Sequence, residues 1–462
     1  MIERLADTEQ GAWDLAWVAG FIDSIRQYIH VREEDGLLIV VPNQAHRLNA
    51  TGLHILKCLL DGETMASLLE QAGDTSERRR DIHYFLCDVR ALVMGCLHEG
   101  QRREGVETVP YEGSFNVLPV LSELAVTYRC NLRCAFCYAS CNCTSREAPD
   151  GEMSTAEAKR VIERIRREAD VPSISFTGGE PMLRDDLCEL IALARELGMR
   201  VNLITNGTLI TPDSAEALVA SGLNSAQVSL EGGSADVHDA LTRQPGSFDA
   251  TCAGIRHLQR TGIHVHTNTT VSRGNIDCVE QVVDCVAGMG LDRLSMNMVI
   301  PCGSALESPE QVWVRYDEIG PAVLRVRQRA REQRGPRVLS GVEFMWYSPT
   351  PYCLFNPIAE GLGNKGCAAC DGLLSVAPNG DVLPCSSFEQ GVGNLLEHDF
   401  RSIWDSPGAE YHKRNEHAPA VCRRCEHFHI CNGACPLYWQ AMGEDELAAD
   451  MCSPAGVQRD TV

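Results

Sequence analysis

Three cysteines stand within eight residues of one another, at Cys130, Cys134 and Cys137. They follow a short apolar run at 124–127 that is typical of a strand. Thiolates are soft ligands, and three of them on one tight loop can hold an iron–sulfur cluster. A closed [4Fe–4S] site takes four cysteines, so this spacing indicates a cluster with one iron left free to bind another molecule.

A second set of cysteines lies in the C-terminal part of the chain, in short spacings typical of metal sites. Its members are Cys367, Cys370, Cys385, Cys422, Cys425, Cys431, Cys435 and Cys452. Cys-x2-Cys pairs bind iron–sulfur clusters and also structural zinc, so zinc is the alternative for this array. The chain has 22 cysteines in all, and these spacings favour a reducing compartment over a disulfide-bonded secreted protein.

Length and charge narrow the class of protein further. At 462 residues the chain can form two or three domains. No apolar run reaches the ~20 residues of a membrane span, and the N-terminal residues do not have the pattern of a signal peptide. We therefore expect a cytoplasmic protein that does not bind membranes. The net charge of −22 argues against nucleic-acid binding, which needs clustered Lys and Arg.

The first hundred residues combine strand and helix patterns. The expected elements are a helix within 1–30, strands at 37–41 and 45–49, and helices at 51–60, at 64–72 and over 82–93. Residues 101–120 begin with a stretch that has no periodicity, which predicts a linker between domains.

After the linker, strands and helices alternate. The expected strands are 121–128, 173–176, 200–205, 225–230, 265–271 and 294–299, with helices at 155–169, 187–197, 212–221, 248–261 and 276–289. This order predicts an α/β fold with a parallel sheet, whose ligand site lies at the carboxyl ends of the strands. We expect a partial (β/α)6 TIM-like barrel over 121–335 and a small cysteine-rich domain over 336–462.

Residues suited to hold a polar ligand follow these strands. The segment Gly178-Gly179-Glu180-Pro181 comes after the second strand. Glycines let the backbone approach a ligand closely, and exposed amides with a carboxylate can bind an ammonium group. The further candidates at or after the strand ends are Asn206, Ser229, Glu231, Arg243 and Asn268.

The pattern Cys-x3-Cys-x2-Cys after a strand, with aromatic neighbours, resembles the signature of the radical S-adenosylmethionine (SAM) enzymes. In that family the free iron chelates SAM, and reductive cleavage of SAM gives a 5′-deoxyadenosyl radical. The resemblance implies that the Gly178 segment holds the amino group of SAM. It also implies that Phe136 and Tyr138 flank the adenine. Arg243 would pair with the SAM carboxylate, the alternative being a solvated loop charge.

Two more of the candidates take expected roles from this resemblance. Ser229 and Glu231 stand in Ser-Leu-Glu-Gly, where the family commonly has Ser-Leu-Asp-Gly, so Glu231 is a mild departure. They are expected to bind ribose hydroxyls or the methionyl end of SAM. The resemblance identifies no catalytic acid or base.

The C-terminal array resembles the SPASM extension of peptide-maturing radical SAM enzymes, which binds two auxiliary [4Fe–4S] clusters. The implied ligands of the first cluster are Cys367, Cys370, Cys385 and Cys435, and those of the second are Cys422, Cys425, Cys431 and Cys452. With the cluster of the first loop, three [4Fe–4S] clusters and SAM are the expected cofactors. No role is assigned to Cys141, Cys143, Cys302 or Cys353.

The strand pair and three helices of the first hundred residues resemble the winged-helix peptide chaperone of pyrroloquinoline-quinone biosynthesis. In ribosomal-peptide pathways this unit is the precursor-peptide recognition element, to which a leader peptide adds as an extra strand. The alternatives are a winged helix that only packs on the enzyme and, less in keeping with the charge, DNA binding.

Together these resemblances predict a radical SAM enzyme that modifies a ribosomally made peptide by a thioether, carbon–carbon or related crosslink. The expected partners are a precursor peptide with its leader and a reducing protein such as flavodoxin or ferredoxin. One alternative is a radical SAM enzyme for a sulfatase cysteine, a tetrapyrrole or another cofactor precursor. An iron–sulfur electron carrier or redox sensor is the alternative from a different class.

Overall fold

The computed structural model describes residues 13–42, 44–94, 117–141, 151–333 and 341–447. The chain divides into two compact units, Met1–Val120 and Leu121–Val462. In the part that the structure describes, no helix is long and apolar enough to cross a membrane.

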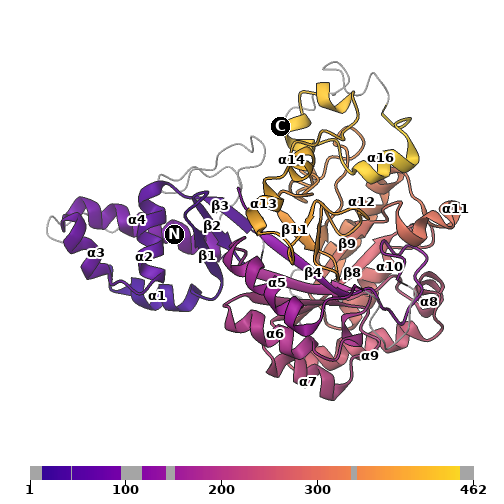
Figure 1. Cartoon of the computed structure of the whole chain (residues 1–462), viewed down its shortest axis with the longest axis horizontal. Helices are drawn as coiled ribbons and strands as arrows, with labels where there is room; N and C mark the ends of the chain where they lie inside the picture. The colour runs from indigo at the N-terminus through magenta and orange to yellow at the C-terminus, as the bar shows by residue number, and fades with distance from the viewer. Residues whose placement is uncertain (1–12, 43, 95–116, 142–150, 334–340, 448–462) are drawn as a thin grey trace. The chain divides into compact units, whose positions relative to one another are not determined.

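The first unit is a small antiparallel sheet with four helices (Figure 1). Its elements are α1 Trp17–Ile25, β1 Ile29–Arg32, β2 Leu37–Val40, β3 Gln44–Arg47, α2 Ala50–Leu60, α3 Met65–Ala72 and α4 Ser76–Val93. The sheet order is β1-β2-β3, with β2 in the centre. The two predicted strands and three predicted helices are therefore present. The strand β1 was not predicted, because its residues follow a helical apolar pattern without a clear break.

Short polar side chains fix where the helices of this unit begin. Asn49, Thr64 and Thr75 each accept a backbone N–H from the first turn of the helix that follows, and such caps contribute about 1 kcal/mol each. Gly52 lets α2 approach α4, since a Cβ at this position would lie 2.6 Å from the Phe85 ring. The helices bury one apolar face of the sheet.

A buried arginine joins the last residues of the first unit to its sheet. The side chains of Arg32 and Asp35 form an ion pair, Nη2 to Oδ2, at 2.7 Å, and both are 1% exposed. Arg32 also donates to the carbonyl oxygens of Leu118 and Pro119, at 2.9 and 2.7 Å. A buried guanidinium needs all these acceptors, so the contacts hold residues 118–119 against the sheet. The end of the predicted linker thus packs with the first unit.

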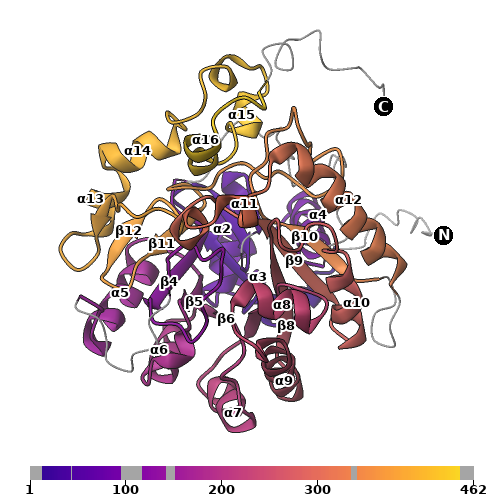
Figure 2. The same cartoon turned by 90° about the vertical axis from the view of Figure 1, so that its right-hand side faces the viewer.

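The second unit is built on a ten-stranded sheet in the order β10-β9-β8-β7-β6-β5-β4-β11-β12-β13. The parallel strands β4 Leu121–Thr127, β5 Ser173–Gly178, β6 Arg200–Thr205, β7 Ser225–Ser229, β8 His264–Val271 and β9 Arg293–Met298 are the six predicted ones. The helices between them are α5 Thr155–Arg167, η1 Pro181–Leu183, α6 Leu187–Glu196, α7 Pro212–Ala220, α8 Ala235–Thr242, α9 Ser247–Arg260 and α10 Gln281–Gly288. In Figure 2, α5, α6, α7, α9 and α10 lie outside the curved sheet. The predicted partial barrel is confirmed.

The C-terminal part continues this sheet at both edges, which was not predicted. Its elements are η2 Gly303–Leu306, α11 Pro309–Val312, α12 Tyr316–Glu332, β10 Glu343–Trp346, β11 Leu373–Val376, β12 Asp381–Leu383, β13 Gly393–Asn394, α13 Phe400–Trp404, α14 Pro407–Lys413, η3 Cys422–Arg424, α15 Phe428–Cys431 and α16 Pro436–Met442. Strand β10 pairs with β9, and β11 pairs with β4, both in parallel. The cysteine-rich segment is thus joined to the barrel by backbone hydrogen bonds.

Candidate active site

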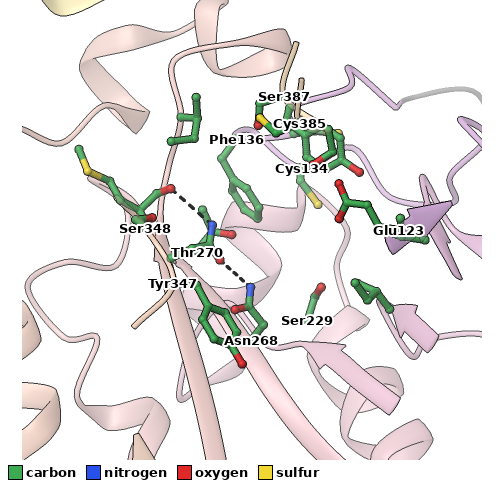
Figure 3. A pocket seen from close by; sticks show the side chains of 18 of the residues that line it. Glu123, Cys134, Phe136, Ser229, Asn268, Thr270, Tyr347, Ser348, Cys385 and Ser387 are labelled. Atoms are coloured by element: carbon green, nitrogen blue, oxygen red, sulfur yellow. Dashed lines mark hydrogen bonds between the residues drawn. The ribbon is translucent and has the colours of Figure 1, made fainter. Parts of the chain in front are cut away.

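A cavity of about 480 Å³ lies at the carboxyl ends of the barrel strands. Its wall includes the three cysteines of the first loop, polar residues from β5 to β9, and cysteines of the C-terminal array. Figure 3 shows Cys134, Cys385 and Glu123 on one side of it and Tyr347 and Asn268 on another. The topology rule that places a ligand at this edge of the sheet is thus borne out by a cavity there.

The cysteine loop is held to the barrel through its backbone. Arg133 N–H and Ala135 N–H donate to the carbonyl oxygens of Thr242 and Leu241, at 3.1 and 2.9 Å, at the end of α8. Asn206 donates its side-chain N–H to Asn131 Oδ1 at 2.9 Å, and its Nδ2 lies 3.9 Å from Cys130 Sγ. These contacts hold the loop against the barrel.

The loop thiols have the chemistry that a cluster needs. Burial raises the pKa of Cys130 to about 12 and that of Cys134 well above its usual value, while a hydrogen bond from the Cys141 thiol lowers that of Cys137. All three line the cavity. A metal cation can replace the protons of the buried Cys130 and Cys134 thiols, and Cys137 loses its proton more readily than a free thiol, so the donor set fits a metal cluster.

The glycines after β5 are required by close packing against this loop. A Cβ on Gly178 would lie 2.1 Å from Thr127 O, and one on Gly179 would lie 2.2 Å from Arg129 O. The Gly179 and Glu180 N–H groups donate to these same two carbonyls at 2.8 Å. Gly178 also has φ +142°, which favours glycine. The backbone of this segment therefore contacts the residues just before the cysteine loop and also forms part of the cavity wall.

We expect Gly178→Ala to lower the stability of the barrel by about 3 kcal/mol, because both the φ angle and the carbonyl of Thr127 oppose a side chain. Gly198→Ala is the matched control, since Gly198 has φ +77° and nothing within 4 Å of its Cβ position. That change should cost about 1 kcal/mol. Thermal unfolding compares the two variants, and equal losses would show that the contact with Thr127 is unimportant.

Most of the predicted SAM-binding residues line this cavity: Phe136, Tyr138, Gly178, Gly179, Asn206, Ser229, Glu231 and Asn268. Among them, Glu231 accepts a hydrogen bond from Thr270 N at 2.8 Å, and burial raises its pKa to about 8. Asn268 donates to Asn297 Oδ1 at 2.6 Å. The structure therefore brings these side chains together, and their contacts with SAM stay a prediction.

Three predicted residues are not among those that line the cavity. Glu180 is fully buried and accepts hydrogen bonds from Thr205 Oγ1 and Asn206 N, both at 2.8 Å. These bonds join the end of β5 to the end of β6. Pro181 begins the short helix η1 that follows. Arg243 ends α8 in the left-handed conformation. Its Nη1 lies 3.8 Å from Glu307 Oε2, and both side chains are exposed. The solvated alternative for Arg243 thus describes its position in this structure.

The C-terminal cysteines extend the same cavity. Cys367, Cys385 and Cys435 line it together with the thiols of the first loop. Cys370 is fully buried, and its N–H donates to Pro384 O at 3.1 Å. The hairpin between β11 and β12 turns at Gly380, with φ +88°, and so returns the chain to Cys385. Cysteines of the first loop and of the first auxiliary set therefore line one cavity.

The second auxiliary set is described only in part. Cys422 begins η3, Cys425 follows it and Cys431 ends α15, whereas Cys452 lies outside the described residues. Across the described ranges, no three His, Cys, Asp or Glu side chains meet closely enough for one metal ion.

Glu123 is a residue of the cavity that the sequence interpretation missed. It stands in the middle of β4, accepts a hydrogen bond from Ser375 Oγ at 2.7 Å, and is also bonded by Ser386. Burial raises its pKa. A single carboxylate inside a buried strand was the available signal, because strands of a parallel sheet are otherwise apolar. Gln227, Asn297 and Tyr347 also line the cavity and carry no comparable signal.

The cysteines without a predicted role differ in position. Cys141 is buried beside the first loop, and its N–H donates to Cys137 Sγ at 3.3 Å. Cys302 is buried and hydrogen-bonded to Ser387, whereas Cys353 is exposed. Cys143 lies outside the described residues.

Family models match two parts of the chain. Residues 124–286 match the radical SAM superfamily, and residues 367–426 match the SPASM iron–sulfur cluster-binding domain. The chain is 31% identical over 351 residues to an AdoMet-dependent heme synthase of Nitratidesulfovibrio vulgaris, covering 71% of this chain and 90% of the relative. It is 28% identical to a PqqA peptide cyclase of Ruegeria pomeroyi, covering 72% of this chain and 87% of the relative.

A solved structure has the same fold over more of the chain. Streptococcus suis SuiB bound to its precursor peptide SuiA superposes with a TM-score of 0.61 at 16% identity, covering 89% of this chain and 94% of SuiB. Leu121–Val462 makes up only roughly three quarters of the residues, so this match extends into the first unit. The chain therefore belongs to the radical SAM superfamily, as an enzyme with a SPASM domain that uses SAM and multiple [4Fe–4S] clusters.

Proposed function

We propose that this radical SAM enzyme crosslinks a ribosomally synthesised peptide whose leader binds to the first unit. When bound, SAM and its cluster supply the abstraction of a hydrogen atom from the substrate. The product is a thioether, carbon–carbon or related bond. The observation that carries the choice of substrate is that no Lys or Arg is among the described residues that line the cavity.

Glu123 and Glu231 are the acidic side chains among the described residues that line the cavity, and no Lys or Arg is among them. Burial raises the pKa of both carboxyl groups, so this wall disfavours negative charge. Tetrapyrroles of the haem type carry several carboxylates, which would find no cationic partner here. A peptide core with neutral side chains needs no such partner. The cavity therefore favours a peptide over a tetrapyrrole.

The first unit offers an edge to which a peptide strand can add. Leu48, the residue after β3, donates its backbone N–H to Gly36 O. Two residues earlier, His46 of β3 pairs with Leu38 of β2. Alternation along an antiparallel strand then turns the backbone N–H and C=O of Ala45 away from β2. Main-chain pairing at such an edge recognises a leader with varied side chains. The similarity in fold to SuiB, whose structure contains a precursor peptide, supports a peptide as the substrate.

Each crosslink removes two hydrogens from the peptide. One leaves as an atom and ends in 5′-deoxyadenosine, and the other leaves as a proton and an electron. Cys367, Cys385 and Cys435 line the same cavity as the first loop, which supports a role for them in holding an auxiliary cluster that could accept this electron. A reducing protein such as flavodoxin or ferredoxin would start each turnover, and the protein would act in the cytoplasm.

A tetrapyrrole remains the second candidate, because the heme synthase of Nitratidesulfovibrio vulgaris is 31% identical to this chain. Other small substrates or a sulfatase cysteine have less support. An electron carrier or redox sensor does not need the Gly178 segment, and the family match gives it no support.

The test compares the two classes of substrate in separate reactions. Anaerobically reconstituted enzyme receives SAM, a reductant and either the peptide encoded beside its own gene or an iron tetrapyrrole that carries propionates. We expect mass spectrometry to show loss of two hydrogen atoms per crosslink in the peptide and an unchanged tetrapyrrole. A modified tetrapyrrole beside an unmodified peptide would reverse the assignment. Formation of 5′-deoxyadenosine in both reactions is the control for an active enzyme.

A further inference from the structure

Two cysteines outside the predicted cluster sites meet between neighbouring helices of the barrel. Cys252 lies on α9 and Cys285 on α10, and the Cys252 thiol donates a hydrogen bond to the sulfur of Cys285. A second contact joins the same helices, from Gln259 Nε2 to Met289 O at 3.0 Å. On α9, Gln259 lies about two turns after Cys252, and on α10 the C-terminal cap Met289 lies about one turn after the other cysteine. The two thiols therefore face each other where the helices touch.

The two thiols differ in exposure and in acidity. Cys252 is buried, whereas Cys285 is half-buried, so a small molecule in the solvent reaches the sulfur of Cys285 first. The hydrogen bond from Cys252 and the charge of Arg256 lower the pKa of Cys285, and the same hydrogen bond raises the pKa of Cys252. An accessible thiol that ionises readily, next to a second thiol, is the arrangement of cysteines that react with oxidants and then form a disulfide.

Both helices lie outside the sheet and hold loops that form the cavity wall (Figure 2). Thr251, the residue before Cys252 on α9, donates its side-chain hydroxyl to Asn206 O at 2.9 Å. Gly233, in the loop after β7, packs so closely on α10 that a Cβ there would lie 2.6 Å from the carbonyl carbon of Gln281. Asn206 and Glu231, from these two loops, line the cavity. A movement of α9 against α10 would therefore change the cavity wall.

We propose that Cys252 and Cys285 are a redox modification site, at which hydrogen peroxide forms a disulfide between α9 and α10 that weakens SAM binding. The Cys285 thiolate attacks one oxygen of the peroxide, the O–O bond breaks, and the products are a sulfenic acid and hydroxide, which takes up a proton to become water. The Cys252 thiol then attacks this sulfenic sulfur, so the S–S bond forms, the S–O bond breaks and a second water leaves. The two thiols lose two electrons and the peroxide gains them. A covalent bond is shorter than a hydrogen bond, so the disulfide draws the helices together.

The first experiment looks for the disulfide in full-length reconstituted enzyme. The protein receives one equivalent of hydrogen peroxide without oxygen, is quenched in acid and is then treated with N-ethylmaleimide to block the remaining thiols. We expect mass spectrometry of the digest to show the peptides of Cys252 and Cys285 linked, and separate again after dithiothreitol. Iron analysis before the quench should show that the clusters are retained. No linked peptide, or linkage that appears only after iron is lost, would overturn the proposal.

Serine variants separate the two roles, because serine is close to cysteine in size and its hydroxyl can still donate a hydrogen bond. Cys252→Ser removes the second sulfur, so the sulfenic acid should persist at Cys285 and be labelled by dimedone. The matched internal control is Cys278, which is also half-buried but whose pKa burial raises. In this variant Cys285 should be labelled about tenfold more than Cys278. Equal labelling of the two would show that the pair has no special reactivity.

Equilibrium dialysis then tests the effect on the cavity. Peroxide treatment should raise the Kd for SAM about tenfold in the wild-type enzyme, and dithiothreitol should restore it. Cys252→Ser, treated in the same way, should keep its Kd, because it cannot form the disulfide. A linked pair with an unchanged Kd would exclude an effect on the cavity. An equal rise in both proteins would assign the loss to damage elsewhere and would also overturn the proposal.

Discussion

Replacing Cys130, Cys134 and Cys137 together with alanine should abolish SAM cleavage and remove one cluster of three. Three loop cysteines and eight in the C-terminal array provide one open and two closed sites, so reconstituted wild-type enzyme should hold about 12 Fe and the variant about 8. Colorimetric iron analysis and chromatography of 5′-deoxyadenosine measure the two effects. Loss of activity is expected to be complete because the loop supplies every protein ligand of that cluster.

The control for this variant replaces three cysteines outside both arrays. Cys58, Cys188 and Cys278 are half-buried and belong to neither predicted set. Their joint replacement by alanine should leave iron content and SAM cleavage near the wild-type values. If the loop variant kept about 12 Fe, the loop would not be a cluster site. Stoichiometric zinc in the loop variant would contradict the auxiliary-cluster assignment.

Removal of the first unit, Met1–Val120, should separate SAM cleavage from peptide modification. This unit contains none of the predicted cluster ligands, so uncoupled formation of 5′-deoxyadenosine should persist. Leader binding raises the local concentration of the core peptide, and its loss should lower the rate of peptide modification about 100-fold at low peptide concentration. Modification at the full rate would show that the unit only packs on the enzyme.

A point variant tests the edge strand without removing the unit. Ala45→Pro takes away the backbone donor that faces away from β2, and we expect it to weaken leader binding in a fluorescence-anisotropy measurement. Ser76→Pro is the control, because Ser76 is exposed at the first position of α4, where proline is well tolerated. Equal affinity in both variants, with intact circular dichroism, would exclude pairing at β3.

The six barrel strands could be predicted because they alternate along the chain with helices of regular periodicity. The strands β10 and β11 could not be predicted, since Glu343–Trp346 and Leu373–Val376 are four residues long and gain stability from pairing with β9 and β4. The helix α8 was also missed. Its eight residues follow the loop after β7, and its last carbonyls accept hydrogen bonds from the cysteine loop, a contact far away in sequence.

Within the site, residues with a local pattern were easier to find than residues defined by their neighbours. The glycines at 178 and 179 stand in a motif, and the structure gives the reason, a close approach to Thr127 and Arg129. Arg243 has the same kind of motif, but its side chain lies near Glu307. A sequence motif shows which residues follow one another. The direction of a long, exposed side chain depends instead on the residues around it in the folded protein.

The sequence by itself determined the metal chemistry, because cluster ligands lie on short loops where spacing and residue type are sufficient. It also determined the parallel barrel, through periodicity. Only the tertiary structure decided that thiols of the first loop and of the first auxiliary set line one cavity, and that Glu123 and Glu231 are the acidic groups in its wall. The physical reason is that burial and hydrogen-bond satisfaction depend on residues brought together from distant strands, and no local pattern records which of them meet.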